Sequence, residues 1–100
     1  MIETHVSLYL ASRERLASLQ KTLSFEALPR MHEFVKVRNR EQGDYFAFSV
    51  MQITHCEGGL PQLWLHLTTV FDGRVKVSFL DDGELDEYVE GYKQEGWVLA

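Results

Sequence analysis

The stretch QLWLHLTT, residues 62–69, alternates strictly between two kinds of side chain. Leucines occupy every second position, and Trp64, His66 and Thr68 lie between them. Because successive side chains of a strand point to opposite faces of a sheet, the pattern predicts a strand whose leucines face a core. The side that carries Trp64 and His66 is then left for solvent or for a partner.

Four other segments alternate in the same way. Residues 2–10, 31–38, 45–54 and 74–80 each place apolar side chains on one face, which is typical of strands. The alternative is one long helix over residues 3–25, so that residues 3–11 would be helical, and a strand followed by a helix is favoured. The separators NREQGD, HCEGGLP and FDG are short and rich in turn-forming residues, so they favour antiparallel hairpins.

Two segments have helical spacing. In residues 12–28, Leu16, Leu19 and Leu23 recur at steps of three and four, with Ser12 as a plausible N-cap. The segment around residues 82–95 has the same periodicity. Asp81 and Glu84, at its start, have capping-box spacing, and Asp82 is the alternative cap. Gly96 is expected just past its end. The apolar tail WVLA, residues 97–100, either packs on the core or adds a short strand.

The last hairpin has two possible registers. A two-residue turn at Asp72-Gly73 would be of type I′, whereas a three-residue loop would pair Val70 with Arg74. A shift of one residue exchanges the two faces, so we expect the buried pattern to decide. We therefore predict the three-residue loop, which adds three residues to the core face: Val75, Val77 and Phe79.

Together these elements predict a single α+β domain over residues 1–100. The expected fold is two-layered, with a four- to five-stranded, mainly antiparallel sheet and two helices on one face, in the order β-α-β-β-β-β-α. The predicted core of the sheet comprises Val35, Val37, Phe46, Phe48, Val50, Leu63, Leu65, Leu67, Val75, Val77 and Phe79.

Composition narrows the possible functions. The net charge of −5 argues against general affinity for nucleic acid, and no apolar run is long enough for a membrane span. The N-terminus does not have the basic region of a signal peptide, and the single cysteine, Cys56, permits no intramolecular disulfide. We therefore expect a cytoplasmic protein that does not bind membranes.

The uncovered sheet face is the main candidate site. It is expected to carry four basic side chains (Lys36, Arg38, Arg74 and Lys76) mixed with aromatic ones. Its predicted contact residues are Phe34, Tyr45, Trp64, His66 and Arg74. Such a surface fits a protein partner or a second copy of the chain, or single-stranded nucleic acid, in which bases stack on aromatic rings. An ordinary solvated sheet face would look similar.

The acidic run DDGELDEYVE, residues 81–90, is a second candidate. Its predicted contact residues are Asp82, Asp86, Glu87 and Glu90, which could attract a basic protein. The simpler interpretation is that acidic residues favour a helix N-terminus and its solvated side.

Catalysis is not predicted. A thiol nucleophile with His66 as base would use Cys56, but no spacing typical of a metal or thiol site occurs. We expect no cofactor and no metal. The sequence thus predicts a small non-enzymatic protein-binding module of inhibitor, immunity or adaptor type, or a homodimer; single-stranded nucleic-acid binding is the alternative.

Overall fold

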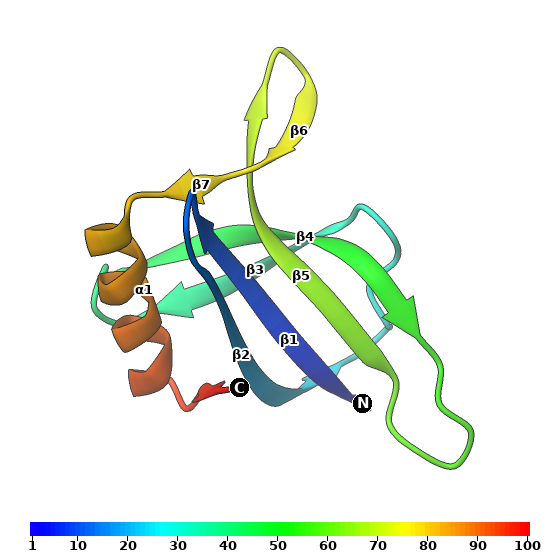
Figure 1. Ribbon diagram of the computed structural model, residues 1–100. Helices are drawn as coiled ribbons and strands as arrows, with labels where there is room; N and C mark the ends of the chain where they lie inside the picture. The colour runs from blue at the N-terminus through cyan, green and yellow to red at the C-terminus, as the bar shows by residue number, and fades with distance from the viewer.

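The computed structural model describes the backbone of residues 1–100 and all side chains except those of Val70 and Phe71. One sheet and one helix make up the fold (Figure 1). The elements are β1 (Ile2–Ser12), β2 (Leu16–Phe25), β3 (Phe34–Asn39), β4 (Asp44–Thr54), β5 (Gln62–Phe71), β6 (Arg74–Val77), β7 (Phe79–Leu80), α1 (Asp82–Gln94) and β8 (Val98–Leu99).

The sheet has the strand order β3-β4-β5-β1-β2-β8, with β6 paired to β5 and β7 paired to β1. It curls so strongly that β3 and β4 lie behind β1 and β5 (Figure 1). The helix α1 and the residues after it link the two ends of the curl. Lys21 of β2 donates to the carbonyl of Glu95, and the Glu95 carboxylate pairs with Arg40, just beyond β3, at 3.2 Å.

The core fills the inside of this curl. Phe48 of β4 meets Tyr92 of α1 edge to face, with ring centroids 5.8 Å apart. Trp97 packs beside them and is 4% exposed. The other buried apolar residues are Val6, Leu8, Leu10, Leu19, Val37, Val50, Leu63, Leu65, Leu67, Leu80 and Leu85.

The predicted two-layer α+β fold with two helices is wrong. Residues 16–25 form β2, which pairs antiparallel with the whole of β1, and the sheet has eight strands. The prediction of a mainly antiparallel sheet also missed two parallel pairings of β1, with β5 and with β7. Parallel pairing joins segments far apart in sequence, so no local turn signal announces it.

The misassigned segment has an identifiable cause. Inward positions of β2 alternate through Ala17, Leu19, Lys21 and Leu23, so one lysine breaks the apolar pattern. Lys21 lies opposite Val6 and keeps its ammonium 6.0 Å from the Trp97 ring centre. A lysine that covers apolar surface with its stem looks polar in sequence while occupying an inward position.

The predicted cap at Ser12 is also reinterpreted. Its hydroxyl accepts from the backbone N–H groups of Glu14 and Arg15, at 3.3 and 3.0 Å. This is the bonding of an N-cap, but it closes the turn between β1 and β2. The same local chemistry serves turns and helix starts, so the residue type alone could not distinguish them.

The register predicted for the last hairpin is wrong. Phe71 pairs with Arg74 and Val70 with Val75, which leaves Asp72-Gly73 as a two-residue turn. Both turn residues have positive φ, 50° and 72°, as type I′ requires. The hairpin extends beyond the body of the sheet (Figure 1), so no core is present there to select the other register. As a result, Val75 and Val77, predicted for the core, are exposed. Phe79, also predicted for the core, is exposed in β7, which pairs with β1.

Other predictions are confirmed. Residues 2–12 form a strand, and each of the four later alternating segments contains one. The helix α1 begins at the capping box of Asp81 and Glu84, and Gly96 follows its end with φ 96°. Both alternatives for the tail occur, because Trp97 is buried in the core and β8 pairs with β2.

A buried amide attaches α1 to the sheet. The Asn39 side chain, fully buried, donates to the carbonyl of Tyr88 at 2.9 Å and accepts from the N–H of Gln42 at 3.2 Å. It lies directly against Gly91, where a methyl group would overlap the Asn39 carboxamide. Gly91 therefore provides the space in which the helix and this amide meet.

We predict that Gly91→Ala destabilises the protein. Alanine favours a helix interior by about 1 kcal/mol over glycine, but the overlap with Asn39 should cost about 1–3 kcal/mol and reverse the sign. Urea unfolding measures the difference. Gly83→Ala, in the same helix with only an ordinary contact 3.5 Å from Asp81, is the matched control and should be neutral or stabilising. A Gly91→Ala protein more stable than the parent would contradict this account of the attachment.

Candidate functional site

The outer face of the sheet, opposite the core, carries an aromatic cluster at its centre. Because β1 and β5 run parallel and pair Ser7 with Trp64 and Tyr9 with His66, these side chains share one face. The Tyr9 ring is stacked on His66 at 5.1 Å and tilted against Trp64 at 5.4 Å between ring centres. Trp64 is 39% exposed, so the indole is not sealed inside the molecule.

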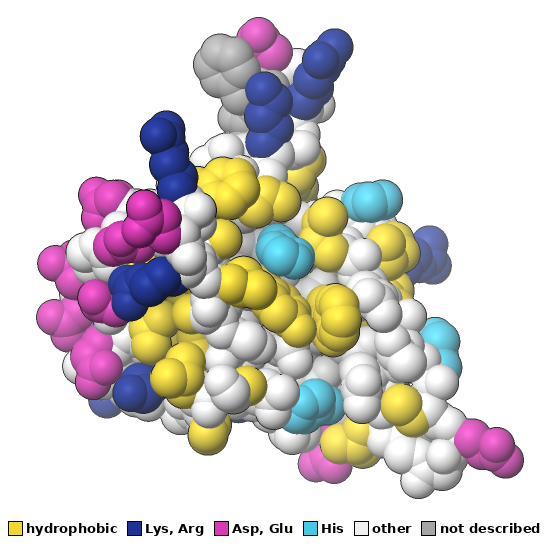
Figure 2. Space-filling view, in the orientation of Figure 1, with side chains coloured by type: hydrophobic (Ala, Val, Ile, Leu, Met, Phe, Trp, Pro, Cys, Tyr) yellow, Lys and Arg dark blue, Asp and Glu magenta, His cyan; other side chains and the backbone are white. Residues whose placement is uncertain are grey.

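Exposed apolar side chains surround the cluster. In the neighbouring row, Ala11 pairs with Phe79 of β7 on one side and with Leu16 of β2 on the other. Phe79 and Leu16 are 64% and 65% exposed. We call Tyr9, Leu16, Trp64, Val77 and Phe79 the apolar band. Figure 2 shows hydrophobic side chains running across this face, with acidic side chains gathered beside it over α1.

Four of the five predicted sheet residues lie on the outer face. The strand pairs Phe34–Ser49–His66 and Arg38–Tyr45 put Phe34 and Tyr45 on the side of His66 and Trp64. The fifth predicted residue, Arg74, does not lie on the outer face. In the observed register Arg74 and Lys76 alternate with Val75 and Val77, and it is Val77 that pairs with Thr68 on the outer face.

Three important residues were missed. Tyr9 was detectable, because the alternation of residues 2–10 puts it opposite Val6, Leu8 and Leu10. Leu16 was assigned to a helix, and Phe79 to the core. Both errors come from pairings of β1, with β2 and with β7, that the sequence does not reveal.

The predicted acidic surface is largely engaged within the molecule. Asp82 accepts from the Ser12 hydroxyl at 2.6 Å, and Arg15 pairs with Asp82 and Asp86 at 3.3 and 3.0 Å. Glu90 lies 3.8 Å from Lys93, whereas Glu87 is exposed. Asp82 and Asp86 therefore attach the start of α1 to the β1–β2 turn.

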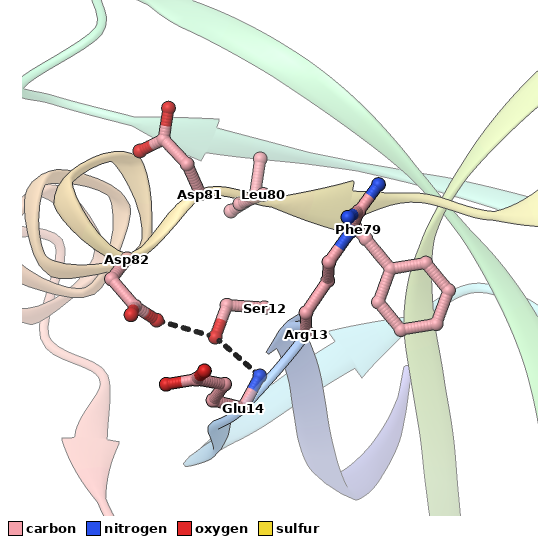
Figure 3. Close-up of a pocket in the computed structure, with 7 residues that line it drawn as sticks. All are labelled: Ser12, Arg13, Glu14, Phe79, Leu80, Asp81 and Asp82. Atoms are coloured by element: carbon pink, nitrogen blue, oxygen red, sulfur yellow. Dashed lines mark hydrogen bonds between the residues drawn. The ribbon is translucent and has the colours of Figure 1, made fainter.

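A groove of about 550 Å³ lies between that turn and the start of α1. Figure 3 shows Asp82 and Glu14 near Ser12, with Phe79 and Arg13 at the other side of the groove. The Ser12 hydroxyl, followed by Arg15, lowers the pKa of Asp82. Asp82 is therefore ionised at neutral pH and keeps its contacts to Ser12 and Arg15. The groove lies where these contacts attach the start of α1 to the β1–β2 turn.

The residues weighed for catalysis do not converge. Thr54 pairs with Gln62, four residues before His66, which corresponds to about 13 Å along the strand. Cys56 lies two residues beyond Thr54, in an exposed loop. Among the side chains that the structure describes, no three His, Cys, Asp or Glu groups gather as metal ligands would. Among the residues that the structure describes, the helix α1 is too short and too polar to cross a membrane.

Comparison of the chain with protein-family models, with curated proteins and with solved structures gives no match. Any statement about function therefore depends on the geometry of the outer face itself.

We predict that Ser12→Ala raises the pKa of Asp82 toward its ordinary value. The Ser12 hydrogen bond is the largest cause of the lowered pKa. The variant also loses the two turn contacts that the Ser12 hydroxyl accepts, so its free energy of unfolding should fall. A carboxyl chemical-shift titration and urea unfolding measure the two effects. Ser24→Ala, at an exposed position of β2, is the control. An unchanged Asp82 pKa in the Ser12 variant would argue against this attachment.

We also predict that acid destabilises the fold through His66. Burial lowers the pKa of His66 below 6.5, so between 6.5 and that lower value the unfolded chain binds the proton more readily than the folded one. This effect is absent above pH 6.5 and grows as the pH falls. The drop in Tm between pH 7.5 and 5.5 should be smaller for His66→Gln than for the parent.

The control for this measurement is His55→Gln, which removes an exposed histidine and should leave the drop in Tm unchanged. Titration of His66 by NMR gives the pKa directly. A His66 pKa at or above 6.5 would mean that the imidazole of His66, stacked on Tyr9, is not desolvated as described.

Proposed function

We propose that this protein is a non-enzymatic protein-binding module that uses the outer face of its sheet. The observation that carries the proposal is the apolar band, in which Leu16 and Phe79 are about two-thirds exposed beside an aromatic cluster whose Trp64 is 39% exposed. Contiguous exposed apolar surface with aromatic residues at its centre is typical of protein interfaces.

The distribution of charge favours a protein over a nucleic acid. The rows through the cluster are Phe34–Ser49–His66–Tyr9–Ser18, Gln52–Trp64–Ser7–Gln20–Val98 and Thr54–Gln62–His5–Thr22. These described rows contain no lysine or arginine, although phosphate binding requires clustered cations. Of the four cations predicted for this face, Arg74 and Lys76 belong to the opposite side of the β5–β6 hairpin, whereas Lys36 and Arg38 share the side of Phe34 in β3, at the edge of the sheet.

The acidic helix is not part of the proposed surface. Asp82 and Asp86 are held by Arg15, so a basic partner would compete with contacts that attach α1 to the sheet. The proposal therefore assigns binding to the sheet and attachment of the helix to these acidic residues. An inhibitor or adaptor role is compatible with such a surface, because binding alone is sufficient for either.

Photocrosslinking in the cells that make the protein tests the proposal. A photoreactive phenylalanine analogue replaces Phe79, where an exposed aromatic ring already exists, and in a second variant it replaces Leu60, an exposed loop residue outside the band. We expect a discrete protein adduct from position 79 and none from position 60. The analogue at position 79 should form no adduct in a chain that also carries Leu16→Glu.

Other outcomes would overturn the proposal. An adduct at position 79 that nuclease digestion removes would identify a nucleic acid instead of a protein. No adduct at position 79, or equal adducts at both positions, would mean that the band is an ordinary solvated surface.

A further inference from the structure

We propose that the apolar band binds a second copy of this chain, so that the protein is a two-fold symmetric dimer formed through the outer faces of two sheets. This inference rests on the proposed function and names the partner. It follows from three features of the same face: its exposed apolar area, the lack of charged side chains in the rows through the aromatic cluster, and the hairpin that extends from it.

The exposed apolar area matches what a homodimer needs. The exposed parts of Leu16, Trp64, Val75, Val77 and Phe79 range from 36% to 65% of each residue. With about 150–250 Å² for a whole aromatic side chain and less for an aliphatic one, they amount to roughly 500 Å² on each copy. A stable interface buries about 800 Å² per partner, of which about 65% is apolar in homodimers, so the two areas agree.

Charge favours a second copy of the same chain. In a two-fold contact the same patch lies on both sides and side chains near the axis meet their own copy, so a patch with charges of one sign would face like charge. The paired rows through Tyr9, His66 and Trp64 contain no acid, lysine or arginine, and His66 is held neutral by burial that lowers its pKa. The acidic side chains of α1 lie beside this face and not on it (Figure 2). The rows through the aromatic cluster can therefore meet in two copies without opposing carboxylates, whereas Phe79, at the edge of the band, lines the groove that also contains Arg13, Glu14 and Asp82.

The β5–β6 hairpin provides the rest of the contact. It extends beyond the body of the sheet (Figure 1) and presents Val75 and Val77, which are 47% and 36% exposed, on the side that continues the outer face. Arg74 and Lys76 occupy the opposite side of the same strand. An arm with one apolar and one basic side can lay its valines on a neighbouring copy while its cations stay in solvent.

Sedimentation equilibrium and light scattering of the full chain between 1 and about 200 µM test the inference. We expect the mass of two chains, twice 11.6 kDa, at the upper concentrations. Leu16→Glu with Phe79→Glu places a carboxylate on each side of Ala11, at positions already exposed, and should weaken dimerisation at least 100-fold with an unchanged circular dichroism spectrum. Leu60→Glu adds the same charge outside the band and should remain dimeric.

A second variant tests the hairpin. Val75→Ser with Val77→Ser should weaken dimerisation about 10-fold without unfolding the body, because neither valine belongs to the core. A parent protein that remains monomeric at 200 µM overturns the inference, as does a dimer that both pairs of substitutions leave intact. If the parent is monomeric but position 79 still crosslinks to another protein, the proposed function survives and only the choice of partner fails. A parent protein that is monomeric and forms no crosslink from position 79 overturns both the dimer inference and the proposed function.

Discussion

The parallel pairing of β1 with β5 is the interaction on which the rest of the structure depends. It sets Val6 beside Leu63 and Leu8 beside Leu65 in the core, and by the same register it sets Tyr9 beside His66 on the opposite face. Because strand side chains alternate, one set of backbone hydrogen bonds fixes both the buried layer and the exposed aromatic cluster. A slip of one residue would exchange core and surface across the middle of the sheet.

A strongly curled sheet leaves two strand edges apart, and polar contacts attach the helix that joins them. Asn39 is held against Gly91, and Arg15 and Ser12 hold the start of α1 through Asp82. Buried and half-buried polar groups are stable only when they are hydrogen-bonded, so these contacts also select one position for the helix. Asp82 and Asp86 therefore have a role within the fold itself.

The β5–β6 hairpin follows a different rule from the strands inside the body. Within the body, burial of alternate side chains selects the register. Beyond it, the conformational preference of Asp72 and Gly73 is sufficient, and the turn that they form turns Val75 and Val77 toward the outer face. The same change removes two cations from the aromatic surface, which is why the hairpin register bears directly on the kind of partner that the surface can bind.

The sequence by itself determined what depends on local order. Alternation identified β1 and the strands of residues 34–80, the capping box identified α1, and parity separated Leu65 from Trp64. Only the tertiary structure decided which strands meet, that residues 16–25 are a strand, and that Leu16 and Phe79 extend the surface around Tyr9. The physical reason is that periodicity reports which side of an element is buried, whereas parallel pairing, the position of Lys21 over Trp97 and a hairpin without a core depend on neighbours distant in sequence.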